Sequence, residues 1–387
     1  MKSFNFHQTT RIVFGSGKIT ELPVIAKSFG LKVLLVTTPP SNKALEDQYK
    51  LVQDLLTYNG LEVIHFDGVV PNPTVESIST GAKLAKDYGV EMIIGLGGGS
   101  SMDSAKAISV EATHPGSAWD YLFYKGQPDP EKLLPVIAIS TTSGTGSQVT
   151  QVAVITNPEE RDKSALYNNI LYPQVCIVDP ELMLTVPKFV TACTGFDVLC
   201  HSFESLLHPN NGAYVNMMAW QAISLVIENL PGLVNNLEDI KAREKMAWAD
   251  TMAGLCIANA GVTLPHGMGM AIGGMYPHVA HGEALAIIYP AFAEFTQAYE
   301  IHKFAKLARM LNKELENLSD EVAAEQSPVE IKIFLAKIGL TKTLRDVMIP
   351  EEELEALAKQ CMVLPDYKGN PRVATEEEML ELVRKSY

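Results

Sequence analysis

The chain has 387 residues, enough for about two domains of roughly 100–200 residues each, and 47% of them are hydrophobic, which supports two packed cores. Its formal charge is 31 − 45 = −14, which excludes surfaces that attract nucleic acid or anionic lipid. The five cysteines are scattered without a CxxC pair, so neither a disulfide framework nor a thiolate zinc site is indicated.

Targeting segments are also not indicated. The N-terminal sequence MKSFNFHQTTR lacks the apolar core of a secretory signal, and no run of about 18 apolar residues occurs. We therefore expect a cytoplasmic protein that acts on a small molecule, without nucleic acid or membrane partners.

The first half of the chain alternates short apolar runs with helical patterns. Continuous apolar runs, rather than strict alternation, are typical of parallel strands covered on both faces. The predicted strands are residues 32–38, 61–66, 91–96, 133–140 and 174–179. Apolar spacing predicts a helix over residues 75–88, so this half reads as βαβ units around a parallel sheet.

The second half of the chain changes character, because no convincing strand follows Pro187. Helical patterns recur instead, separated by breakers such as Pro231–Gly232. The predicted helices are residues 191–207, 213–230, 240–260, 290–311, 327–338, 351–361 and 376–385. We expect an α/β dinucleotide-binding domain over residues 1–185 and an all-α domain over residues 186–387.

Two loops of small residues follow predicted strands. Residues 97–100 (GGGS) run from a strand into a helix, where backbone N–H groups and the helix N-terminus suit a pyrophosphate. Residues 140–147 (STTSGTGS) offer hydroxyls for phosphate and ribose. Each loop alone is compatible with an ordinary turn. Open α/β sheets bind ligands along the carboxyl ends of their strands, so the pair predicts a nucleotide site.

A second constellation combines a carboxylate with three imidazoles. Asp197 and His201 lie four residues apart, which places them on one face of a helix. His266 and His281 are each followed by glycine, which lets a backbone come close to a bulky site. One Asp and three His suit Fe²⁺, Zn²⁺, Co²⁺ or Mn²⁺ with an open position for substrate. Packed histidines and a capping Asp are the alternative; Glu204 suits solvent exposure or a supporting contact equally.

These motifs resemble the iron-containing alcohol dehydrogenase family. They occur in chain order over nearly the whole sequence: TRIVFGSGKITEL, PNPT, GGGSSMDSAKAI, STTSGTGSQVT, TGFDVLCHSFES, LPHGMGMA and HVAHGEA. The resemblance implies a Rossmann-like domain, a helical domain of the dehydroquinate synthase type, and a homodimer. It implies that Asp197, His201, His266 and His281 hold Fe²⁺, or Zn²⁺ or another divalent metal. It implies that NAD or NADP is held by Gly97, Gly98, Gly99, Ser100, Asp103, Thr141, Thr142, Thr145 and Lys163.

The sequence departs from the family pattern at three places. Met270 stands where the family often has a histidine near the substrate, and His278 is the available substitute as catalytic residue for proton exchange. The predicted strand at 32–38 ends at Thr38, the expected ribose position, without the carboxylate that would repel a 2′-phosphate, so NADP is not excluded. The usual GTGSE loop ends here in Gln148.

The resemblance implies a metal-dependent oxidoreductase that transfers a hydride between a nicotinamide cofactor and a small primary alcohol or diol and its aldehyde. The alternatives are a polyol (glycerol-type) dehydrogenase or another enzyme of the superfamily with a specialised substrate. Outside the enzymes, a nucleotide-binding regulator with an inactive metal site would need a missing ligand, and all four candidate ligands are present.

Overall fold

A six-stranded parallel sheet forms the centre of the first structural unit. The computed structural model describes residues 2–125 and 133–387. The strands are β1 (Arg11–Phe14), β2 (Lys32–Val36), β3 (Glu62–Phe66), β4 (Met92–Gly97), β5 (Val136–Ser140) and β8 (Val175–Val178), in the order β1-β8-β5-β4-β2-β3. All five neighbouring pairs are parallel. The predicted α/β class and parallel sheet are thus confirmed.

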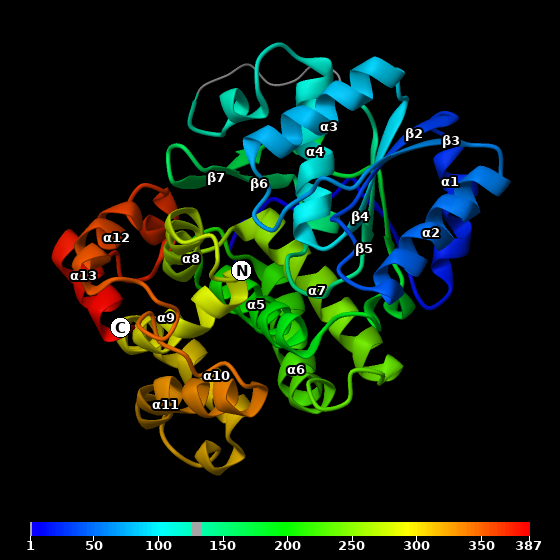
Figure 1. The fold of residues 1–387 in the computed structure, drawn as a ribbon. Helices are drawn as coiled ribbons and strands as arrows, with labels where there is room; N and C mark the ends of the chain where they lie inside the picture. Colours follow the sequence, from blue (N-terminus) through cyan, green and yellow to red (C-terminus); the bar gives the residue numbers. More distant parts are fainter. Residues whose placement is uncertain (1, 126–132) are drawn as a thin grey trace. The chain divides into compact units, whose positions relative to one another are not determined.

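Helices cover both faces of this sheet (Figure 1). They are α1 (Leu22–Ala26), α2 (Lys43–Tyr58), α3 (Val75–Tyr88) and α4 (Gly99–Thr113). Leu34 and Val36 of β2 pack in one core with α3 and α4, and Val33 and Leu35 pack in another with α1 and α2. Burial on both faces is the physical reason for the continuous apolar runs in the sequence.

Two further elements complete this unit, which comprises residues 7–186 and 238–258. The antiparallel hairpin of β6 (Val152–Asn157) and β7 (Asp162–Tyr167) was not predicted. Helix α7 (Ile240–Ala260) belongs almost wholly to this unit, although the sequence places it in the helical half. This unit runs unbroken from His7 to Val186, and most of α7 returns to it from later in the chain.

The second unit is helical and comprises residues 1–6, 187–237 and 259–387. Its helices are α5 (Lys188–Leu207), α6 (Ala213–Leu233), α8 (Leu264–Met275), α9 (His281–Thr296), α10 (Ile301–Leu311), α11 (Asp320–Ile338), α12 (Leu354–Gln360) and α13 (Glu376–Lys385). α5 packs on α6 and α9, and α8 packs on α9. Among the residues that the structure describes, none beyond 187 forms a strand, as predicted.

Several helix limits differ from the prediction. The predicted helix over 290–311 is two helices, because α9 starts at His281 and a 3-10 turn at Gln297–Tyr299 separates it from α10. Helix α11 begins at Asp320, seven residues earlier than predicted, since Ser319 caps its N-terminus and Pro328 is accommodated inside. In the described ranges no single helix is long and apolar enough to cross a membrane, although one bent pair of consecutive helices meets both criteria jointly.

Candidate metal site and cofactor loops

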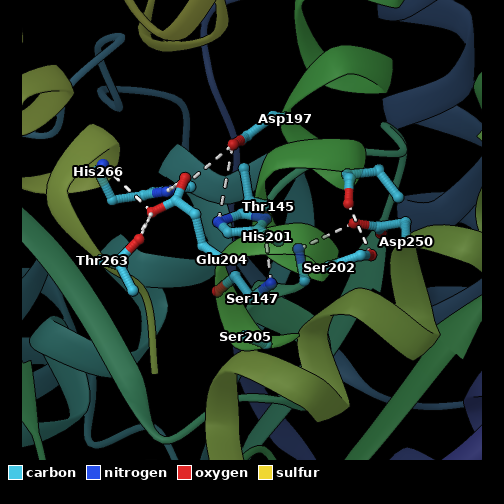
Figure 2. Close-up of polar contacts among 12 residues, drawn as sticks. Thr145, Ser147, Asp197, His201, Ser202, Glu204, Ser205, Asp250, Thr263 and His266 are labelled. Carbon is cyan, nitrogen blue, oxygen red and sulfur yellow. Dashed lines mark hydrogen bonds and ion pairs between the residues drawn. The ribbon is translucent and has the colours of Figure 1, made fainter. Parts of the chain in front are cut away.

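Helix α5 supplies the first two members of a buried cluster. Asp197 and His201 are 3% and 6% exposed, and Asp197 Oδ1 lies 3.7 Å from His201 Nε2. The same carboxylate oxygen lies 3.3 Å from Nε2 of His266, which comes from α8 (Figure 2). One ligand atom from each of the three residues lies within 4.8 Å of the others. Helical spacing therefore places the α5 pair side by side, and the fold adds His266.

Close glycine contacts bring His281 to the same place. The His266 and His281 ring centroids are 5.4 Å apart. A Cβ at Gly269 of α8 would lie 3.1 Å from His281 Cε1, and a Cβ at Gly282 would lie 2.2 Å from the Cys193 carbonyl oxygen on α5. Side chains at either glycine would push α9 away from its neighbours. Three of the four predicted ligands thus form the compact group, and His281 lies beside His266 at its edge.

The donor set fits a divalent metal ion. Asp197 Oδ1 and His266 Nε2 are both buried and lie 3.3 Å apart, at ion-pair distance, but neither makes a hydrogen bond of good geometry within the described residues. Buried polar atoms left in this way cost free energy unless a ligand or ion satisfies them. A carboxylate oxygen and imidazole nitrogens match the preferences of Fe²⁺ and Zn²⁺.

Glu204 orients the imidazole of His266. Its side chain is fully buried, and its Oε1 lies 2.7 Å from His266 Nδ1. Its Oε2 accepts hydrogen bonds from the Thr263 backbone N–H at 2.9 Å and the Thr263 hydroxyl at 3.3 Å, at the start of α8 (Figure 2). A proton on Nδ1 leaves the Nε2 lone pair directed at the cluster. Of the two interpretations left open for Glu204, the structure shows the supporting one.

The charges in this cluster shift two pKa values in opposite directions. Burial raises the pKa of Asp197, but His201, His266 and His281 outweigh it and lower that pKa to about 2. Burial lowers the pKa of His266, but Glu204 and Asp197 outweigh it and raise that pKa to about 10. Without metal, a proton on His266 therefore balances part of the carboxylate charge.

The affinity of the metal-free protein for a divalent cation should rise with pH from about 6 to 9, by up to about tenfold per unit. His266 must lose a proton held with a pKa of about 10 before its Nε2 can bind a metal, whereas Asp197 is already ionised. Calorimetric titration with Co²⁺ in buffers of different ionisation enthalpy measures the released proton. An affinity independent of pH, without proton release, contradicts this assignment.

The two predicted loops lie beside each other in the α/β unit. Gly97 at the end of β4 pairs in register with Ser140 at the end of β5. A Cβ at Gly99 would lie 2.7 Å from Thr145 Cγ2, and a Cβ at Gly98 would lie 3.2 Å from Thr142 Oγ1. A side chain at position 99 would therefore displace Thr145, and one at position 98 would require a small shift of Thr142. Gly98 caps α4 without a side-chain hydrogen bond, which leaves the helix N-terminus available to an anion.

Asp103 and Lys106 of α4 hold the second loop in place. Asp103 Oδ1 accepts a hydrogen bond from the Ser147 hydroxyl at 2.5 Å, and Oδ2 accepts one from the Val154 N–H at 3.1 Å. The fully buried Lys106 Nζ donates to the carbonyl oxygens of Ser147, Thr150 and Val152 at 2.7, 2.9 and 2.7 Å. The structure thus gives both oxygens of Asp103, a predicted cofactor contact, partners in the protein.

Three other predicted site residues have protein partners in the structure. The Thr38 hydroxyl lies 2.9 Å from the Tyr49 hydroxyl, just beyond the end of β2. Lys163 of β7 donates from Nζ to Asn72 Oδ1 at 2.7 Å. His278 lies exposed in the turn before α9, with Nε2 2.9 Å from the Val347 carbonyl oxygen, and it is not a member of the metal cluster. Their roles toward ligands stay predictions.

Sequence models of two families match the chain. Residues 9–180 match "Iron-containing alcohol dehydrogenase", and residues 191–387 match "Fe-containing alcohol dehydrogenase family, C-terminal". The chain belongs to the iron-containing alcohol dehydrogenase family. This confirms the predicted family and enzyme class, an alcohol-type oxidoreductase.

Curated relatives and solved structures agree with the family. The chain is 33% identical to the NAD-dependent methanol dehydrogenase of Bacillus methanolicus over 99% of both chains. It is 33% identical to the 1,3-propanediol dehydrogenase of Citrobacter freundii over 97% of this chain and 96% of that one. Among solved structures, an archaeal halo-thermophilic Red Sea brine pool alcohol dehydrogenase has a TM-score of 0.93 at 34% identity, with both chains fully covered. The brine pool enzyme therefore shares the fold along the whole length of this chain.

Proposed function

We propose that this protein is a divalent-metal alcohol dehydrogenase whose metal, Fe²⁺ by preference, is held by Asp197, His201, His266 and His281. The observation that carries the proposal is the buried cluster in which possible ligand atoms of Asp197, His201 and His266 lie within 4.8 Å of one another, while Asp197 Oδ1 and His266 Nε2 make no well-formed hydrogen bond within the described residues. When bound, the ion supplies a Lewis acid that favours an alkoxide or polarises a carbonyl. The low exposure of the cluster strengthens that interaction by excluding water.

The side chains have separate tasks in this proposal. Glu204 holds the proton on His266 Nδ1, so that Nε2 is the nitrogen left to bind the metal once the imidazole is neutral. Gly98 and Gly99 leave room at the N-terminus of α4 for the pyrophosphate of a nicotinamide dinucleotide, which supplies the hydride chemistry when bound. Thr142 and Thr145 lie against these glycines and offer hydroxyls to the cofactor.

NADPH is proposed as a cofactor alongside NADH. β2 ends at Val36, and Thr37 and Thr38 follow it with hydroxyls where a carboxylate would repel the 2′-phosphate. Burial raises the pKa of Tyr49, the partner of Thr38, so this pair stays uncharged at neutral pH. A ratio of kcat/KM for NADH over NADPH within about tenfold is expected, because no full charge discriminates between them.

Reduction of small aldehydes tests the function. Iron-loaded protein is assayed with propanal, butanal, 3-hydroxypropanal and glyceraldehyde, each with NADH and NADPH. Turnover of the unbranched aldehydes is expected, and preferential turnover of glyceraldehyde would favour the polyol alternative. No turnover of any aldehyde, although metal and cofactor are bound, would overturn the proposal.

Two further assignments are tested by the same preparation. His278→Ala is assayed because His278 is the sequence-based candidate for proton exchange; its contact with the Val347 carbonyl is the alternative role. An unchanged pH profile of turnover removes it from the mechanism. The family resemblance supports a homodimer, which sedimentation at equilibrium measures.

A further inference from the structure

Asp250 connects helix α7 to the loop that follows β5. It is 1% exposed, and its carboxylate accepts two hydrogen bonds from the loop. The Gly146 N–H donates to Oδ1 at 2.9 Å, and the Gln148 side-chain amide donates to Oδ2 at 2.7 Å. About a hundred residues of sequence separate Asp250 from this loop, so only the fold brings them together.

The loop is also fixed sterically against α7. Gly146 has φ of 62°, a left-handed conformation that favours glycine. A Cβ at Gly146 would lie 2.4 Å from Gly254 Cα of α7, and a Cβ at Gly254 would lie 2.6 Å from Val149 Cγ2. Since the two glycines meet without a flexible side chain between them, a displacement of α7 would move the loop with it.

The other side of the same loop is held from α4. Lys106 donates to the carbonyl oxygens of Ser147 and Thr150, and Asp103 accepts from the Ser147 hydroxyl. Thr145, which lies against Gly99, immediately precedes the turn held in this way. The position of the Thr145 hydroxyl relative to the glycine loop is therefore set by α4 on one side and by α7 on the other.

We propose that Asp250 and Gln148 form a positioning pair that sets the affinity of the loop for the nicotinamide dinucleotide. This inference rests on the proposed function, because it assumes that the dinucleotide binds at this loop. It also gives a reason for the amide at position 148, where the family resemblance leads one to expect an acid. A carboxylate there would face the Asp250 carboxylate across a buried contact, whereas the amide donates to it.

A reciprocal exchange of the two side chains tests the pair. In Gln148→Glu, two buried carboxylates face each other, and the Kd for NADH should rise by about tenfold or more. In Asp250→Asn, a neutral acceptor for the Gly146 N–H remains, so a smaller rise of about threefold is expected. The double variant combines Gln148→Glu with Asp250→Asn. The asparagine amide on α7 then donates to the glutamate carboxylate on the loop, and the pair keeps the net charge of the native pair. The Kd should then return to within about twofold of the wild type.

The readout is NADH fluorescence with metal-free protein, measured well below the Tm of every variant. Glu244→Gln, an exposed charge removal on the same helix, is the matched control and should leave the Kd unchanged. The positioning role would be overturned if the Gln148→Glu protein had a lower Tm but bound NADH with the wild-type Kd. It would also be overturned if the double variant bound NADH no more tightly than the Gln148→Glu protein. If the wild type binds neither NADH nor NADPH, the proposed function fails instead.

Discussion

His266→Ala is expected to remove the bound metal and to lower aldehyde turnover by at least about 10³-fold, or ~4 kcal/mol of transition-state stabilisation. The substitution deletes the Nε2 atom that lies 3.3 Å from Asp197 Oδ1. It also leaves the Glu204 carboxylate buried without the imidazole 2.7 Å from it. The substitution therefore removes one metal ligand and the hydrogen bond that orients it.

Metal content by elemental analysis and turnover with butanal are the two measurements for this variant. His302→Ala is the matched control, since the His302 side chain is 90% exposed on α10, and it should keep both metal and activity. Circular dichroism establishes that the variant folds. A folded His266→Ala protein that keeps its metal and its turnover would contradict the assignment of the site.

Glu204→Gln is expected to weaken metal binding by about 10–100-fold while leaving the fold intact. Glutamine keeps one oxygen for the Thr263 N–H, but it turns its amide N–H₂ toward His266 Nδ1. Nδ1 must then accept a hydrogen bond, which moves the imidazole proton to Nε2, where it blocks metal coordination. The substitution thus alters the tautomer and hardly changes side-chain volume.

Metal affinity by competition with a chelator measures this effect, and the imidazole ¹⁵N shifts of His266 in protein saturated with Zn²⁺, where the ring is neutral, report the tautomer. The matched control is Glu330→Gln, a buried glutamate of α11 whose oxygen accepts from Asn312 at 2.9 Å and can still do so as an amide. Equal metal affinity in Glu204→Gln and the wild type would mean that Glu204 only caps α8.

The parallel sheet was predictable because its central strands can be recognised in the sequence without knowledge of the rest of the fold. β2, β4 and β5 are buried on both faces and show as apolar runs in the sequence. The hairpin of β6 and β7 lacks that signal, since its strands mix buried residues with partly or fully exposed ones. Helix α8 was not predicted, because its glycines resemble a loop in sequence and serve close packing in the fold.

Local spacing determined the part of the site that lies on one element. Asp197 and His201 follow from one helical turn, and Gly98 and Gly99 follow from a strand that leads into a helix. The roles of Glu204 and Asp250 could not be assigned in this way, because the role of a buried carboxylate depends on the hydrogen-bond donors that face it. Those donors, at Thr263 and His266 for one and at Gly146 and Gln148 for the other, come from distant segments.

The sequence by itself therefore determined the family, the sheet, the candidate metal ligands and the two loops, because each is indicated by a motif or pattern within a short range of residues. Only the tertiary structure decided how these parts are supported: Glu204 behind His266, Lys106 beneath the loop, and α7 returning to the α/β unit through Asp250. The physical reason is that a buried charge is stable only beside its partners, and chain folding, not sequence proximity, supplies them.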